Sequence, residues 1–138
     1  MMCPRRIPLA IVTILYLLLL SCRNGGQESN LYDRIIAADT SKYCRVPDAC
    51  FNPHVLAVES GFYVTTFLGS KPRYKHVPTK ELARYLLAIP MEAWPRGPSI
   101  AVSPTDDVID HNAVERNFYA AQQICRSMGL EVQVLFGG

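Results

Sequence analysis

The second half of the chain alternates between the apolar patterns of strands and of helices. Residues 55–58 and 62–68 are apolar, aromatic and β-branched runs separated by Glu59-Ser60-Gly61, which predicts a β-hairpin. Residues 74–77 return briefly to the strand pattern before Pro78. The first elements of the domain are therefore expected to be two paired strands.

Two helices are predicted from apolar positions that recur every three or four residues. Thr79 is the expected N-cap of the first, and Pro90 ends it. Its apolar stripe is Leu82, Tyr85, Leu86 and Ile89. The stripe of the second helix is Val114, Phe118, Ala121, Cys125 and Met128, and Gly129 follows as the end of that helix.

Two further strands complete the pattern. Residues 99–103 form a short apolar run, and alternate residues are apolar from Leu130 to Phe136. Between these elements, residues 91–98 form a proline-rich loop whose Trp94 is expected to cover the core. The chain from residue 54 to 138 is thus predicted to be an α+β domain in β-β-α-β-α-β order, with two helices packed on one face of a small sheet.

The first 22 residues have a different pattern. Arg5 and Arg6 precede an uncharged apolar run from Ile7 to Leu20, and Ser21-Cys22 follows. This layout resembles the signal of a bacterial lipoprotein, because the run is shorter than the roughly 20 residues that span a bilayer. The resemblance implies that residues 1–21 are a cleaved signal peptide and that Cys22 carries the lipid. A plain secretory peptide and a retained membrane helix are the alternatives.

Residues 22–53 are predicted to be a lipidated tether. Residues 23–29 are polar and glycine-bearing, as in a flexible linker. Asn30 is placed to cap a short helix in which Leu31 and Ile35 share a face. The expected tether therefore contains one small helix.

Net charge argues against nucleic-acid binding. Removal of residues 1–21 takes Arg5 and Arg6 from the 14 lysines and arginines and none of the 12 acidic residues, so 12 of each charge remain. A neutral chain without a clustered basic face lacks the attraction to phosphates that such binding needs. No nucleic-acid partner is expected.

Export of the chain changes how its cysteines are interpreted. Cys44 and Cys50 are separated by a short segment containing Pro47 and Asp48, which favours a disulfide in an oxidising compartment. Metal binding by this pair is the alternative, but the spacing is not Cys-x-x-Cys and no second pair exists. Cys125 lies on the predicted apolar stripe and is expected to be a core residue.

The only polar cluster that favours catalysis precedes the second helix: Asp106, Asp107, Asp110 and His111. Carboxylates and an imidazole can bind a metal or transfer protons, so a small secreted enzyme using Asp107 and His111 is one hypothesis. Acidic residues before a helix also cap its free N–H groups and complement its dipole. Capping is the preferred interpretation, and no catalytic residue, metal or cofactor is expected.

The order of elements resembles the periplasmic domain of the ExbD/TolR family of biopolymer-transport proteins. The similarity covers roughly the last three-fifths of the chain and lies in Val55 to Gly61, Val77 to Leu82, Ile100 to Val108 and Met128 to Leu130. The family resemblance implies a membrane helix with an acidic residue for proton-driven motion, but residues 7–20 contain no Asp or Glu. The chain thus resembles the soluble domain of that family without its motor.

These observations favour a non-catalytic envelope lipoprotein that faces the periplasm or the cell exterior. Its ExbD/TolR-like domain is expected to bind a protein partner or cell-wall material such as peptidoglycan, and Cys22 to hold it at a bilayer. The resemblance also implies a homodimer, for which the edge of the strand from Leu130 to Phe136 is a pairing surface. The alternative is a single-pass component of an ExbD/TolR-type transport complex.

Overall fold

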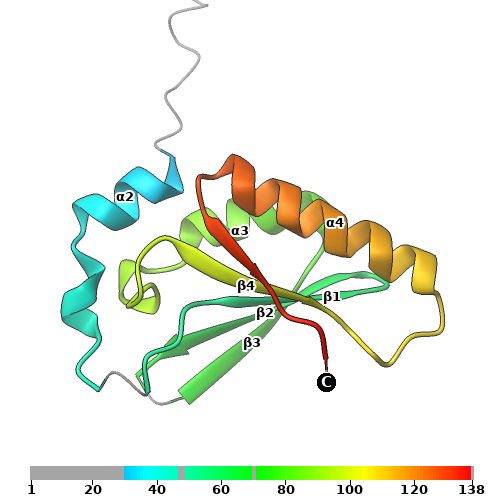
Figure 1. Cartoon of the computed structure of the whole chain (residues 1–138), viewed down its shortest axis with the longest axis horizontal. Helices are drawn as coiled ribbons and strands as arrows, with labels where there is room; N and C mark the ends of the chain where they lie inside the picture. Colours follow the sequence, from blue (N-terminus) through cyan, green and yellow to red (C-terminus); the bar gives the residue numbers. More distant parts are fainter. Residues whose placement is uncertain (1–29, 47–48, 70, 138) are drawn as a thin grey trace, which may run out of the picture.

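A mixed β-sheet is the frame of the domain in the computed structural model, which describes residues 30–46, 49–69 and 71–137 (Figure 1). Its strands are β1 (His54–Val58), β2 (Gly61–Leu68), β3 (Lys71–Val77), β4 (Ser99–Pro104) and β5 (Glu131–Val134). Their spatial order is β3-β2-β1-β4-β5. Strands β1, β2 and β3 pair antiparallel, whereas β4 pairs parallel with both β1 and β5.

The strand β3 is longer and more regular than the sequence indicated. The structure adds this strand to the expected β-β-α-β-α-β order, between the hairpin and the helix that begins at Leu82. The sequence predicted only a brief strand there, at residues 74–77. Pro72 explains the difference, because proline weakens the prediction of a strand but is tolerated at a sheet edge. Strand β3 is such an edge, so its proline removes no hydrogen bond that a neighbour needs.

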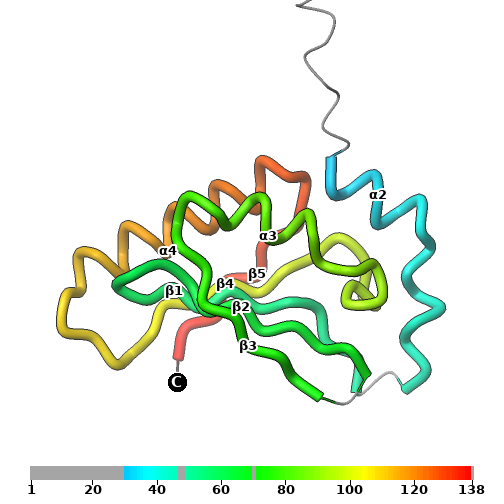
Figure 2. The backbone as a smooth tube through the Cα atoms, turned by 180° about the vertical axis from the view of Figure 1, so that it is seen from behind, coloured from blue at the N-terminus to red at the C-terminus, as the bar shows by residue number. Residues whose placement is uncertain are grey.

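Among the described residues, three α-helices lie on one side of the sheet: α2 (Leu31–Ala37), α3 (Leu82–Ala88) and α4 (His111–Ser127). The view from behind shows the same layering (Figure 2). Short 3-10 helices, η1 (Thr40–Tyr43), η3 (Thr79–Glu81) and η4 (Met91–Ala93), connect them. Thr79 does not cap α3 as expected, because a 3-10 turn comes first and its hydroxyl donates to Asn117 Oδ1 instead.

The core lies between the helices and the covered face of the sheet. The predicted stripes supply it: Leu82 and Leu86 of α3, and Phe118, Ala121 and Cys125 of α4, are all buried. Trp94 is fully buried as well, which confirms that it covers the core. Burial of the Cys125 thiol raises its pKa to about 12, with Arg126 opposing the shift, so this cysteine is an unreactive core residue as expected.

Helix α2 belongs to the same packed unit as the sheet. Asn30 caps it, as predicted, by accepting from the Tyr32 N–H at 3.3 Å. Leu31 and Ile35 are each 1% exposed and lie in the same core cluster as the strands. The small helix therefore contributes two residues to the core.

The expected signal peptide, residues 1–21, lies outside the described residues, as does Cys22. In the part of the chain that the structure describes, no helix has the length and apolar character needed to cross a bilayer.

Candidate binding surface

One face of the sheet is covered by the described helices, and none of these helices covers the other face (Figure 1). The covered face takes alternate residues such as Val55, Val64 and Val102, all fully buried. The residues between them point to the opposite side, as the strand period of two requires. We call these the open face: His54, Leu56, Val58, Tyr63, Thr65, Phe67, Pro72, Tyr74, His76, Ser99, Ala101, Ser103, Glu131, Gln133 and, just after β5, Leu135.

Aromatic rings are the largest groups on the open face. Tyr74 is 70% exposed and Tyr63 is 44% exposed. The Tyr63 ring meets the His76 ring edge-on, with centroids 5.2 Å apart. Phe67 packs against Phe51, which precedes β1, at 5.1 Å. The face therefore offers a series of rings along β2 and β3 that the helices do not cover.

The open face is almost free of formal charge. Glu131 is the single carboxylate among the residues that define it, and none of them is a lysine or arginine. The cations of β3 point the other way, since Arg73 and Lys75 pair with Thr66 and Val64 of the covered face. An uncharged surface of rings and hydrogen-bonding groups favours an uncharged partner.

A hollow of about 390 Å³ lies at one end of the open face, beside the segment that enters β1. Phe51 and Phe67 form an aromatic wall, and His54, Gln133 and Leu135 line it from β1 and the end of β5. Apolar walls with a few polar groups are typical of ligand pockets of this size. The hollow thus continues the open face into a concave site.

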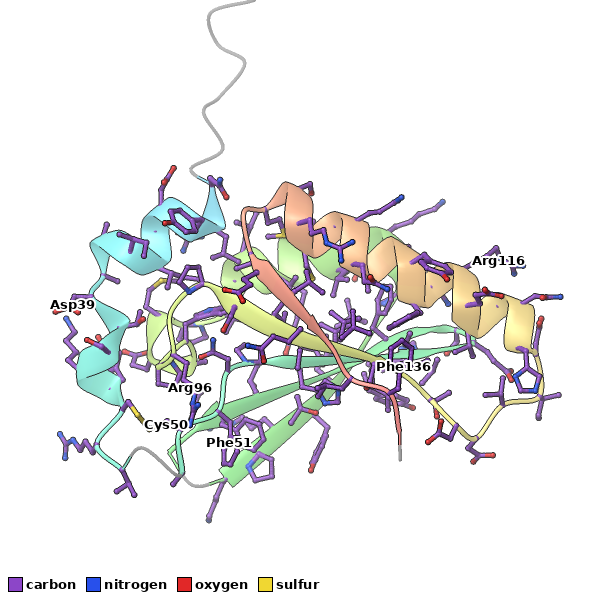
Figure 3. All side chains as sticks on the ribbon, viewed as in Figure 1. Asp39, Cys50, Phe51, Arg96, Arg116 and Phe136 are labelled. Atoms are coloured by element: carbon purple, nitrogen blue, oxygen red, sulfur yellow. A yellow bond between two sulfur atoms is a disulfide. The ribbon has the colours of Figure 1, made fainter. Side chains whose placement is uncertain are left out.

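Asn52 and Arg96 fix the backbone around this hollow, and Figure 3 shows Arg96 close to Cys50 and Phe51. The Asn52 side-chain amide donates to the carbonyl oxygens of Gly97 at 2.9 Å and Ser99 at 2.7 Å, while its oxygen accepts from the Arg96 N–H. The Arg96 Nε–H donates to the Cys50 carbonyl oxygen at 2.7 Å. Segments far apart in sequence are therefore held together around the hollow.

A disulfide holds Cys50, the residue that precedes Phe51 in the chain. Cys44 and Cys50 are bonded, as predicted, with their Cα atoms 5.5 Å apart. The bond closes a small loop between η1 and the entry to β1. It restrains the backbone that carries Phe51 to the open face.

His54 is half-buried on the central strand β1. Its Nε2 atom lies 2.7 Å from the Ser103 hydroxyl on the neighbouring strand β4. Burial lowers the pKa of His54, because the charged imidazolium loses hydration there. Ser103 is only 8% exposed, so the pair is better placed to join two strands than to attack a substrate.

The acidic cluster expected near α4 is divided among separate roles. Asp110 is the N-cap of α4 and accepts from the Ala113 N–H at 3.1 Å, as the capping interpretation predicted. Asp106 and His111 line a cavity beside that helix, whereas Asp107 does not. Among the described residues, no group of three or more His, Cys, Asp or Glu side chains is arranged to hold a metal.

The chain was compared with known protein families, curated proteins and solved structures. No family model, no curated protein and no solved structure matches the chain.

The open face was not predicted from the sequence, although a signal for it exists. In β2, apolar or β-branched residues occupy both alternating sets, with Tyr63 and Phe67 on one side and Phe62 and Val64 on the other. Such a strand has two surfaces that favour packing, and helices were expected on only one of them. The hollow itself could not be anticipated, because its walls come from segments that meet only in the fold.

Proposed function

We propose that the chain is an envelope lipoprotein, held at a membrane through lipidated Cys22, whose folded domain binds cell-wall material without catalysing a reaction. The signal-like order of residues 1–22 supports the anchor. The ExbD/TolR-like pattern supports a periplasmic setting. The observation that carries the binding role is the open face, a surface of five strands that no described helix covers.

The chemistry of the open face favours the glycan strand of the cell wall as occupant. Tyr63 and Tyr74 present exposed rings, which combine a large apolar area with a hydroxyl group at one end. Thr65, Gln133 and His54 supply neutral hydrogen-bonding groups between and beside them. A sugar polymer also combines apolar ring faces with uncharged hydroxyl groups, so it complements a face with a single carboxylate.

Cosedimentation with purified sacculi tests this role. The double variant Tyr63→Ala/Tyr74→Ala of the full chain is expected to reduce binding at least about fivefold, because each aromatic contact contributes roughly 0.5–1.5 kcal/mol. Tyr32→Ala is the matched control, since Tyr32 is a similarly exposed tyrosine on α2, away from this face. Equal binding by the double variant and the control would rule out the open face as the glycan site.

A protein partner is the other outcome that this test distinguishes. Photocrosslinking from position 74 in intact cells would then give a protein adduct, and the chain would not cosediment with sacculi. The location is tested separately by mass spectrometry of the mature amino terminus. An acylated Cys22 is expected at the amino terminus. A mature protein that still carries residues 1–21 would contradict the lipoprotein proposal.

A homodimer is part of the proposal, and the two sheet edges differ in a way that supports β5 as its contact. Strand β3 carries Lys71, Pro72 and Lys75, which are residues that discourage edge pairing. Strand β5 has Glu131 alone as a charge, and its outer edge has no strand neighbour among the described residues. The N–H groups of Glu131 and Leu135 donate to β4, so by the alternation of a strand the Val132 N–H points to the outer edge. Val132→Pro should therefore abolish a dimer detected by crosslinking, whereas Tyr74→Pro on the β3 edge should leave it intact.

A further inference from the structure

A second cavity of about 390 Å³ lies at the other end of the domain, between the loop after β4, the first turns of α4 and the tail after β5. It shares no lining residue with the hollow of the open face. The tail lies close against the loop, because a Cβ atom at Gly137 would overlap the Asp106 carboxylate. The cavity is thus bounded by three separate segments.

Three aromatic rings form one wall of this cavity. The Phe118 ring lies 5.7 Å from that of Tyr119, inclined by 50°, and 6.0 Å from that of Phe136, inclined by 64°. Phe118 is 7% exposed at the base, whereas Phe136 is largely exposed and is labelled below α4 in Figure 3. The cavity wall therefore contains three rings that are inclined to one another and not stacked flat.

Two carboxylates line the same cavity. Asp106 comes from the loop and Glu115 from α4. Within the described part of the chain neither forms an ion pair, and Arg116, the nearest cation in sequence, projects from the outer side of α4 (Figure 3). The cavity therefore holds negative charge that no cation of the described chain neutralises.

Carboxylates other than Asp106 and Glu115 lie at the positive end of α4. Asp110 accepts from the Ala113 N–H. Glu59 Oε1 accepts from the N–H groups of Ile109 at 2.6 Å and Asp110 at 2.7 Å. Asp110 and Glu59 therefore accept the N–H groups of Ala113, Ile109 and Asp110, and neither Asp106 nor Glu115 takes part in these hydrogen bonds.

We infer that this cavity binds an alkylammonium group. A cation is attracted to the faces of aromatic rings within about 6 Å, and enclosing rings with added carboxylates are the means by which proteins recognise quaternary ammonium ligands. The rings of Phe118, Tyr119 and Phe136 contact the alkyl groups, and Asp106 and Glu115 neutralise the charge. The chemistry is shared by a free choline-type amine and by the side chain of a lysine in a peptide.

Titration calorimetry on the full chain in maltoside micelles tests the site. Choline and Nα-acetyl-lysine amide are the two ligand arms. The neutral isostere of choline, 3,3-dimethylbutan-1-ol, is the ligand control. Binding of choline or of the lysine amide, with much weaker binding of the alcohol, is the expected result, and the arm that binds identifies the source of the ammonium group.

Variants separate the two features of the site. Phe136→Leu keeps an apolar side chain at an exposed position and removes one ring, so affinity should fall about 2- to 30-fold. Asp106→Asn/Glu115→Gln should weaken binding at least as much, whereas the control Glu92→Gln, on η4, should bind like the parent. Equal binding of the alcohol, unchanged affinity in both site variants, or no binding of either cation would overturn the inference.

Discussion

The two faces of the sheet are built from alternate residues of the same strands, yet they have opposite characters. The covered face is apolar where the helices pack on it, with Val55, Val64 and Ile100 at most 1% exposed. The open face has rings, hydroxyl groups and imidazoles, and its tyrosines remain accessible. The difference indicates a division of labour in which one face stabilises the fold and the other is available for recognition.

The division can be tested most directly at adjacent positions of β2. Phe62 lies in the core and is fully buried. Its replacement by alanine is expected to lower the free energy of unfolding by about 3–5 kcal/mol, because the transfer energy of the ring is lost and a cavity remains. Denaturant unfolding can be followed by the fluorescence of Trp94, the single tryptophan of the chain, which is fully buried.

Tyr63→Ala is the matched control on the open face. Most surface substitutions change stability by no more than about 0.5 kcal/mol, and the half-exposed Tyr63 should be close to that range. If the two alanine variants lost similar stability, the open face would be a second structural surface, and the proposed division would be wrong.

The disulfide between Cys44 and Cys50 provides a prediction for the end of the open face. Cys44→Ser/Cys50→Ser should lower the free energy of unfolding by about 2 kcal/mol, as expected for a bond that closes a short loop. Reduction of the parent protein should have the same effect and leave the double variant unchanged. A double variant as stable as the oxidised parent would mean that Asn52 and Arg96 alone hold this segment.

Substitution of Asp110, which caps α4 on the covered side of the sheet, should cause a smaller loss of stability. Asp110→Ala should destabilise by about 0.5–2 kcal/mol, since the Ala113 N–H loses its acceptor, whereas Asp110→Asn should retain most of the cap. Thermal unfolding of the two variants measures the difference. Equal destabilisation by both substitutions would show that the charge, and not the hydrogen bond, is what Asp110 contributes.

The covered face could be predicted from the sequence because its signal is local. The stripe from Val114 to Met128 repeats at helical spacing, and Asn30 and Asp110 precede their helices as capping residues do. The α+β class and the Cys44–Cys50 bond followed from the same kind of short-range pattern. Each of these features needs information from only a few neighbouring residues.

The remaining features depend on contacts between distant segments. Strand β3 was underestimated because Pro72 is acceptable only once β3 is known to be an edge. The place of α2 in the core depends on Leu31 joining a cluster whose other members follow much later in the chain. The aromatic cavity likewise joins Phe118 to Phe136, and no periodicity connects these two residues.

The smallest predicted effect concerns His54, a titratable group of the open face on the central strand β1. Burial lowers its pKa in the folded state, so the unfolded chain binds the proton more readily. The contribution of His54 to stability should therefore be complete above about pH 6.5, the usual value of a free histidine, and should be lost as the pH falls through the lower folded-state pKa. Stability should thus decrease with acidification over that window.

His54→Gln isolates this contribution, because glutamine keeps a hydrogen-bonding group near Ser103 but cannot take up the proton. Unfolding free energies of the parent and the variant, measured across this pH range, should converge as the pH falls, with the parent losing more stability than the variant. His76→Gln, on the exposed edge strand β3, controls for the loss of an imidazole from the same face. If parent and His54→Gln had parallel pH profiles, the imidazole of His54 would be as well hydrated as an exposed one. The open face would then be more accessible to water around His54 than the His54–Ser103 contact indicates.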